Sequence, residues 1–229
     1  MNEKNDMPFR FERKYPLPAE RAGEFEQFLK LHPESFRTAF PPRWVNSIYL
    51  DTLDHAAFHR HVEGASRRVK LRIRWYGDLE GAIERPQLEA KIKMNNRNAK
   101  RRAALPDAAF SLGDLPRQVA RWLAALPDDE PLKARAAHLR PVTLVRYHRQ
   151  YHCAGGERCR VTIDTQLCCF GPGPGGAVFR RVAVGAGAVV ELKHDNDQTG
   201  LAAEIVDRFP IRSSRHSKYL KAMRASMPW

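Results

Sequence analysis

The sequence has no run approaching 18 apolar residues, so no helix is predicted to cross a membrane. The first residues, MNEKNDMPFRFERKY, contain no apolar segment of the kind that a secretory signal needs. Cys153, Cys159, Cys168 and Cys169 form no C-x-x-C pair, and the spacing indicates no disulfide framework. The 14 glycines and 16 prolines are too few for collagen or a low-complexity chain. We therefore expect one globular domain, residues 1–229, in the cytoplasm.

Several nucleotide-binding and hydrolase motifs are also missing. The sequence contains no G-x-G-x-x-G, no G-x-S-x-G and no H-E-x-x-H. The segment GPGPGG at 171–176 lacks the G-K-[ST] ending of a P-loop, and its prolines remove backbone donors. These absences argue against a Rossmann dehydrogenase, an α/β-hydrolase, a zinc protease and a P-loop nucleotidase.

Positive charge is abundant. The 229 residues include 39 Lys and Arg against 26 Asp and Glu, a formal net charge of +13. Such an excess suggests a polyanionic partner, and nucleic acid, acidic lipid and phosphate chains all qualify. The composition is also 43% hydrophobic, which is enough to bury a core. Composition alone does not distinguish these partners, so the positions of the charges along the sequence are needed to do so.

The charged residues alternate with apolar ones in six segments, as they do along β-strands. In the segment 68–75, Val69, Leu71, Ile73 and Trp75 alternate with four cations. The residues that share the charged faces of such segments are Arg10, Glu12 and Lys14; Arg68, Lys70, Arg72 and Arg74; Glu89, Lys91 and Lys93; Tyr147, Arg149 and Tyr151; Arg160, Thr162 and Asp164; and Glu191, Lys193 and Asp195.

This alternation has two interpretations. The charged faces could lie in water, as in ordinary amphipathic antiparallel sheets. They could instead point into a closed antiparallel β-barrel, with the apolar faces packed on flanking helices, in an α+β fold. Like charges about 6 Å apart repel by roughly 3 kcal/mol at an effective dielectric constant of about 20, so a cationic lumen would favour a bound polyanion. Periodicity leaves both interpretations open.

Helical periodicity appears between the strands. Apolar stripes predict helices at 18–31, 53–62, 115–126, 199–209 and 218–223. The segment Asn95–Asn98 separates two basic strands and predicts a hairpin. We expect the apolar stripes of these helices to contribute to the core.

Eight short motifs, in this order, resemble the VTC domain, the polyphosphate polymerase domain of vacuolar transporter chaperone proteins. The domain belongs to the triphosphate tunnel, or CYTH-like, superfamily. The motifs are FERKY (11–15), SIYLDT (47–52), KLRIRWYG (70–77), LEAKIK (88–93), RYHRQY (146–151), RVTIDT (160–165), VELKHD (190–195) and HSKYLKAM (216–223). The resemblance implies an antiparallel barrel with an inward charged lining and a divalent metal, Mg²⁺ or Mn²⁺.

The resemblance also implies roles for individual residues. Glu191 matches the metal-binding glutamate of the family. The residues matching phosphate-binding positions are Lys14, Arg72, Arg74, Lys91, Lys100, Arg149, Arg160, Ser217 and Lys218. We add Lys70, Lys93 and Lys193 to the predicted phosphate-binding set because they share the charged faces. The residues predicted to take part in catalysis are Lys14, Arg72, Arg74, Lys91, Glu191 and Lys218.

The resemblance favours a polymerase-like tunnel protein that binds ATP, triphosphate or polyphosphate and transfers phosphoryl groups. Hydrolases of the superfamily begin with E-x-E-x-K, and here Arg10 replaces the first acid, which favours the VTC branch. An inorganic triphosphatase and a non-catalytic polyphosphate-binding module remain alternatives. Nucleic acid is not expected, because the aromatic residues are not grouped as a stacking platform along the sequence. A membrane partner and the phosphoryl acceptor are left open.

Overall fold

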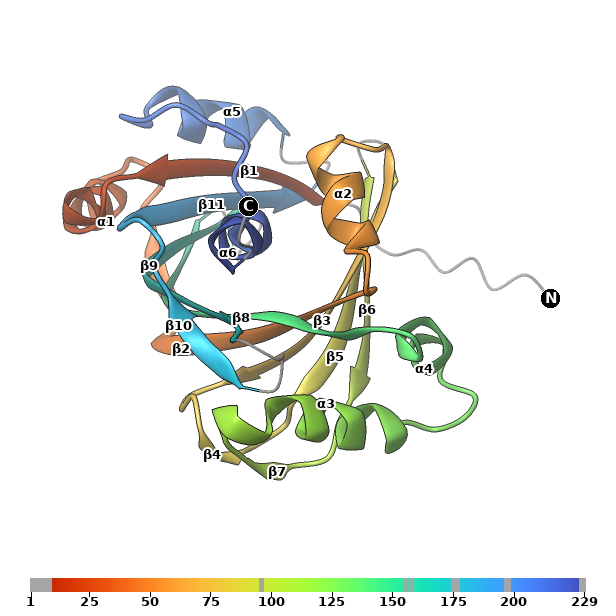
Figure 1. Ribbon diagram of the computed structural model, residues 1–229. Coiled ribbons are helices and arrows are strands. Elements are labelled where there is room, and N and C mark those ends of the chain that lie inside the picture. Colours follow the sequence, from red (N-terminus) through yellow and green to blue (C-terminus); the bar gives the residue numbers. More distant parts are fainter. Residues whose placement is uncertain are drawn as a thin grey trace.

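The alternating segments form a curved, mainly antiparallel sheet in the computed structural model (Figure 1). The structure describes residues 10–94, 97–154, 156, 159–173, 178–195 and 199–226. The strands are β1 (Arg10–Leu17), β2 (Arg37–Asp51), β3 (Arg67–Tyr76), β4 (Gly81–Ile83), β5 (Gln87–Met94), β6 (Arg97–Ala104), β7 (Ala108–Phe110), β8 (Arg140–Ala154), β9 (Cys159–Pro172), β10 (Phe179–Val182) and β11 (Ala188–Asp195). Their hydrogen-bonded order in the main sheet is β1-β11-β9-β8-β2-β3-β5-β6, with β10 paired to β9, while β4 and β7 form a small second sheet.

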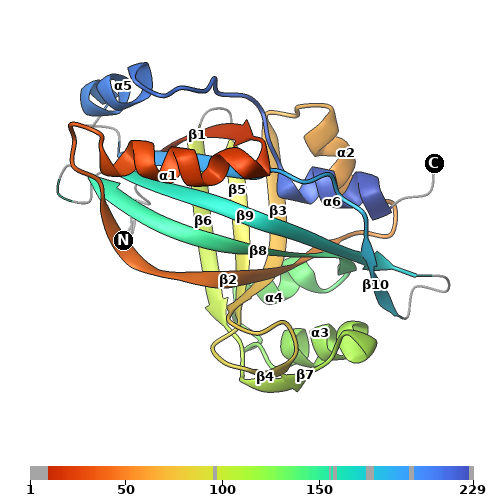
Figure 2. The ribbon, with the colours of Figure 1, turned by 90° about the vertical axis from the view of Figure 1, so that its left-hand side faces the viewer.

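Helices lie on both sides of the curved sheet. They are α1 (Ala22–Lys30), α2 (Ala56–Val62), α3 (Leu115–Ala124), α4 (Pro131–Ala136), α5 (Thr199–Asp207) and α6 (Lys218–Ser226), with 3₁₀ turns at Ala19–Arg21 and Leu112–Asp114. In Figure 1 the strands curve around α6, whereas α1, α5, α3 and α4 lie outside the curve. Figure 2 shows the same arrangement from the side, with α6 at one end of the concave face.

The apolar faces of the strands pack outward on helices. Trp75 of β3 lies 6.2 Å from Trp122 of α3, measured between ring centroids, within a core that includes both strands and helices. A second core joins Val190 and Leu192 of β11 to Phe25 of α1 and Ile205 of α5. The opposite faces of the same strands therefore point toward the concave side. This placement confirms the inward interpretation of the alternating charges.

Closure of the barrel is not confirmed. In the described residues, backbone pairing runs from β1 to β6 and none joins these two margins to each other. The two margins do come close, because β1 lies near β6, and one strand further in, Lys91 Nζ on β5 lies 2.8 Å from Glu12 Oε2 on β1. The sequence of β6, RNAKRRAA, is rich in cations, which is typical of edge strands that avoid further pairing. The fold is thus an α+β protein with an open, strongly curved sheet.

The predicted helices are confirmed with shifted ends. The stripe at 18–31 forms a 3₁₀ turn followed by α1, and the helix predicted at 218–223 extends to Ser226. The predicted hairpin is confirmed by the antiparallel pairing of β5 with β6, although Asn95 and Asn96 lie outside the described residues. Residues 174–177 of the predicted glycine-proline loop also lie outside them. Periodicity did not predict α4, which has only six residues.

Candidate functional site

The charged rows of separate strands converge on the concave side of the sheet. Cross-strand register places Arg72 opposite Glu89, Lys70 opposite Lys91, and Arg149 opposite Asp164. We call this surface the concave charged face. Its cations are Lys14, Lys70, Arg72, Arg74, Lys91, Lys93, Lys100, Arg102, Arg149, Lys193 and Lys218, and its carboxylates are Glu12, Glu89, Asp164 and Glu191. Cations therefore outnumber acids on this face by a wide margin.

Glu89 of β5 is the centre of one ion-pair cluster. Its carboxylate is almost fully buried, and Arg72 donates to Oε2 from Nε at 2.8 Å and from Nη2 at 2.7 Å. Lys100 contacts Oε1, and Arg74 and Arg102 approach at 3.8 and 3.4 Å. Burial favours the protonated form, but Arg72, Arg74 and Lys100 outweigh it and hold the pKa of Glu89 well below its usual range. We call these five residues the Glu89 cluster.

Glu191 of β11 is the centre of a second cluster. Its Oε2 lies 3.1 Å from Lys193 and 3.3 Å from Arg149, and its Oε1 lies 3.5 Å from Lys218 and 3.6 Å from Lys14. Burial would raise the pKa of Glu191, but these four cations hold it well below the usual range. The name Glu191 cluster is used below for these five residues together with Asp164.

Asp164 of β9 fixes two of the cations in the Glu191 cluster. Arg149 donates to both of its oxygens, at 2.5 and 2.6 Å, and Lys218 Nζ lies 2.5 Å from Oδ2. All three side chains are buried. Such a bidentate guanidinium–carboxylate pair sets the direction of Arg149 and leaves the neighbouring Glu191 as its second acceptor.

Lys70 of β3 lies between the two clusters and differs from the other buried cations. Its Nζ is 3.3 Å from His61 Nε2 and 3.3 Å from Ser217 Oγ. Within the described part of the chain it makes no ion pair with a carboxylate. Burial and then the charges of Lys14 and Lys91 lower the pKa of Lys70 to about 6. An anion placed here would restore the ammonium form.

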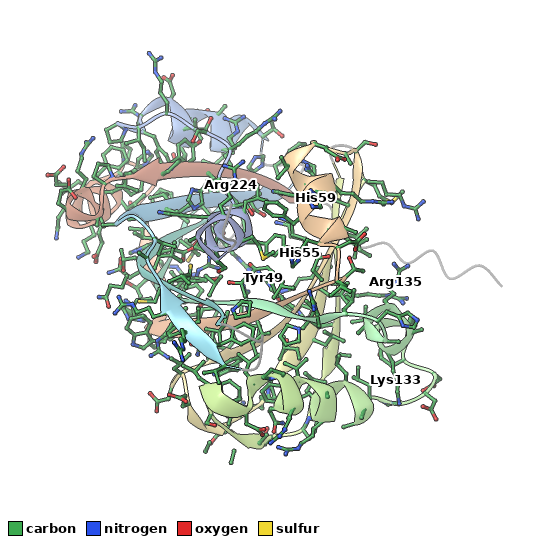
Figure 3. The ribbon with its side chains drawn as sticks, viewed as in Figure 1. Tyr49, His55, His59, Lys133, Arg135 and Arg224 are labelled. Atoms are coloured by element: carbon green, nitrogen blue, oxygen red, sulfur yellow. The ribbon has the colours of Figure 1, made fainter. Side chains whose placement is uncertain are left out.

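The last helix contributes to the site from inside the curve of strands. Ser217 precedes α6, and its hydroxyl accepts from Leu220 N at 3.4 Å, as an N-cap does. Tyr219 donates to the buried Asp51 at 2.6 Å and packs on Tyr49, with 4.9 Å between ring centroids. Figure 3 shows Tyr49 beneath α6, whereas Lys133 and Arg135 on α4 lie outside the strands. Packing and this hydrogen bond hold the Ser217–Lys218 corner against the sheet.

The described residues contain no group of three or more His, Cys, Asp or Glu side chains that could hold a metal by themselves. Two carboxylates do share one cation, because Lys14 Nζ lies 3.1 Å from Glu12 Oε1 and 3.6 Å from Glu191 Oε1. Hard oxygen ligands suit Mg²⁺ and Mn²⁺, which complete their coordination with water or phosphate oxygens. Glu12 and Glu191 therefore fit a divalent ion that arrives bound to phosphate.

A pocket of about 620 Å³ opens beside α6. Tyr147, Asp164 and Lys218 are among its lining residues, together with residues from the end of β1, the start of β11 and the neighbourhood of α6. It reaches the Glu191 cluster but not Lys70 or Glu89. The pocket therefore borders only the Glu191 part of the concave charged face.

The structure brings most of the predicted site residues together. Lys14, Glu191, Arg149, Lys193 and Lys218 meet in the Glu191 cluster, and Arg72, Arg74 and Lys100 meet in the Glu89 cluster. Lys91, Lys70 and Ser217 lie between them. Lys93 is only half-buried and Arg160 is exposed at the start of β9, so these two residues lie at the rim of the concave charged face.

Sequence reasoning assigned no role to Glu12, Glu89 or Asp164, although alternation had already placed them on the charged faces. The hydroxyls of Tyr147 and Tyr49 were also missed. Tyr147 accepts from Arg74 at 3.2 Å, and Tyr49 accepts from Arg72 at 3.4 Å. The aromatic residues are not grouped along the sequence, but in three dimensions aromatic rings from β2, β3 and β8 meet around Arg43.

Comparison with known proteins gives one strong result. The VTC domain family matches residues 9–227. No curated protein matches the chain. A solved structure from Vibrio parahaemolyticus, of a protein proposed to be an adenylate cyclase, has 11% sequence identity and a TM-score of 0.49, covering 93% of this chain and 96% of that chain. The Schizosaccharomyces pombe Mediator head module has 7% identity and a TM-score of 0.49, with 89% and 97% covered.

None of the described helices is long and apolar enough to cross a membrane. The family match extends over all of the described strands and helices, including those that form the concave charged face. The chain belongs to the VTC domain family.

Proposed function

We propose that this protein binds the phosphates of a nucleoside triphosphate or of a polyphosphate chain on its concave charged face and transfers phosphoryl groups between them. One observation carries the proposal. Cations from six strands and α6 face one another with too few carboxylates to neutralise them, and Lys70 has no carboxylate partner among the described residues. A multiply charged linear anion is the ligand that such a row would accommodate.

The arginines and the lysines of the concave charged face have different roles in this proposal. Arg72 and Arg74 are held in place by Glu89 and by the hydroxyls of Tyr49 and Tyr147, so their guanidinium groups are already oriented. Lys70, Lys91 and Lys14 add positive charge, and the repulsion among these cations decreases when phosphate oxygens bind. Phosphoryl transfer depends mainly on positioning and on charge stabilisation, which a preorganised set of cations provides.

A divalent ion, when bound, would neutralise developing charge on the transferring phosphoryl group. Glu191 and Glu12 would hold it, since both carboxylates contact Lys14 and therefore lie close together. Asp164 would keep Arg149 and Lys218 directed at the phosphates. The acceptor would be the end of a phosphate chain, which gives polymerase activity, and with water as acceptor the same groups would act as a triphosphatase.

A specific observation favours a second candidate, a non-catalytic polyphosphate-binding module. Each of the four carboxylates on the concave charged face contacts at least two cations. Carboxylates so engaged contribute to stability and orientation without any metal. Binding would then be the whole function of the face.

Incubation with ATP and Mn²⁺ tests the proposed function. We expect long polyphosphate to form, detected by gel staining, with ADP released in step with the phosphoryl groups incorporated. Free phosphate without polymer would indicate the triphosphatase. Triphosphate binding with neither product would support the binding module, and no binding at all would contradict the proposal.

Lys70 provides a pH-dependent prediction. Its pKa of about 6 means that the amine is mostly neutral at pH 8 before binding, and phosphate contact raises the pKa. Binding at pH 8 should therefore take up about one proton more in the wild type than in Lys70→Met, and wild-type affinity should weaken more steeply as pH rises. Isothermal titration with tripolyphosphate in two buffers of different ionisation enthalpy measures this uptake.

The ligand's own titration is common to both proteins and cancels in the difference. Lys133→Met is the matched control, because Lys133 lies on α4 away from the concave charged face and pairs with Asp128. Equal proton uptake by wild type and Lys70→Met would contradict the prediction that Lys70 gains a proton when phosphate binds.

A further inference from the structure

Three aromatic rings surround Arg43 at the edge of the concave charged face. The Arg43 guanidinium carbon lies 4.0 Å from the ring centroid of Tyr76, 5.0 Å from that of Tyr151 and 5.9 Å from that of Phe40. Arg43 also donates from Nε to the Tyr151 hydroxyl at 3.2 Å, and Phe40 packs edge-on against Tyr151 with 5.7 Å between centroids. We call these four residues the Arg43 cage.

The Arg43 cage adjoins the proposed phosphate site on three strands. Register pairs Arg43 of β2 with Arg149 of β8, the buried arginine that contacts Asp164 and Glu191. Tyr76 follows Arg74 by two residues on β3, and Tyr151 follows Arg149 by two residues on β8. Residues two apart on a strand share a face and lie about 6.6 Å apart. Each tyrosine is therefore the next side chain on the charged row.

The cage is also open to solvent. Phe40 is 51% exposed and Tyr76 is 44% exposed, and Arg43 is exposed as well. The other aromatic residues near the clusters, Tyr49 and Tyr147, are buried. Exposed rings held beside an arginine offer π faces and a planar cation, which are the groups that stack on a heterocyclic base.

We infer that the Arg43 cage binds the base of the nucleoside triphosphate whose phosphates lie on the concave charged face. The inference rests on the proposed function and deepens it, because it assigns the substrate class: a nucleotide is preferred over an inorganic phosphate chain of equal length. The base stacks on the outside of the Arg43–Tyr76 stack, because the guanidinium and the ring are only 4.0 Å apart and leave no room for a base between them. The ribose spans the distance of about 6.6 Å between the tyrosines of the cage and the next residues of the charged row, Arg74 and Arg149.

The test compares two ligands on the same protein variants. Calorimetric titration of Tyr76→Ala with ATP should show affinity about tenfold weaker than in the wild type, since stacking on an aromatic ring is lost. Titration with tripolyphosphate should change less than twofold, because that ligand has no base. Tyr76→Phe keeps the ring and should restore ATP affinity. Phe11→Ala is the matched control, because Phe11 is equally exposed but stacks on His194.

The outcomes separate the inference from the proposed function. Tripolyphosphate binding by the wild type, with ATP affinity unchanged in Tyr76→Ala, would overturn the base site and leave the phosphate site standing. An equal loss of affinity for ATP and for tripolyphosphate in Tyr76→Ala would show that Tyr76 acts structurally, and this result would also overturn the base site. If the wild type binds neither ligand, the proposed function fails and the base site falls with it.

Discussion

Glu89→Gln is expected to destabilise the ligand-free protein by about 3–5 kcal/mol, the range for removing one partner of a buried ion pair. The substitution keeps the size of the side chain but leaves Arg72 and Lys100 without their shared carboxylate, and Arg74 and Arg102 lose the same charge. At roughly 2–4 °C per kcal/mol for a protein of this size, the melting temperature should fall by roughly 6–20 °C. Thermal unfolding followed by circular dichroism measures this change.

Tripolyphosphate should recover much of that lost stability. The cations released from Glu89 become available to phosphate oxygens, so the variant should bind the ligand more tightly than the wild type. Its melting temperature should therefore rise more on ligand binding than that of the wild type. Glu24→Gln is the control, because Glu24 pairs with Arg21 on the exposed surface of α1, where ion pairs contribute little. A Glu89→Gln protein as stable as the wild type would contradict the role of Glu89 as the central acid of its cluster.

Glu191→Gln is expected to separate binding from chemistry. Metal-free affinity for tripolyphosphate should be retained or increased, because one charge that repels the ligand disappears while Asp164 still holds Arg149 and Lys218. Mn²⁺-dependent phosphoryl transfer from ATP should fall about 10²-fold or more, because a misplaced metal loses transition-state stabilisation. Calorimetry without metal and a turnover assay with Mn²⁺ give the two measurements.

Asp164→Asn provides the comparison for Glu191→Gln. Both substitutions add one net positive charge to the same cluster, but Asp164 orients Arg149 and Lys218, whereas Glu191 is the proposed metal ligand. If the effect of Glu191→Gln on turnover were due to charge alone, the two variants would lose the same share of activity. Full turnover in Glu191→Gln would remove Glu191 from the metal site. A wild type with no turnover would leave the binding module as the function of the face.

The two largest expected effects thus come from two carboxylates with different positions in the sheet. Glu89 lies on β5 facing the arginines of β3, and its loss is expected to change stability first. Glu191 lies on β11 beside Lys14 and Glu12, and its loss is expected to change chemistry first. The difference follows from which cations each carboxylate contacts, and both carboxylates occur in similar E-x-K sequences, Glu89-Ala-Lys91 and Glu191-Leu-Lys193.

The sequence determined six strands of the main sheet, every helix but α4, and the side of each of those strands on which the charges lie. Alternation has a fixed period of two, so Lys70, Arg72 and Arg74 had to share one face whatever the rest of the fold did. Helix positions followed from apolar stripes for the same reason. The order of eight short motifs was enough to indicate the VTC family, since a family match needs no knowledge of contacts.

The tertiary structure alone decided which face lies inside and which residues meet. Alternation is the same for a charged face in water and for one in a concavity, and only the packing of Trp75 on Trp122 and of Val190 against α5 distinguishes them. The Arg43 cage joins residues from three strands, and Tyr76 and Tyr151 are 75 positions apart in the sequence. Proximity along the sequence therefore did not predict the cage. The margins of the sheet, β1 and β6, lie near each other without backbone pairing, and Glu12 of β1 contacts Lys91 of the neighbouring β5. Register and curvature arise from long-range contacts, which local periodicity does not encode.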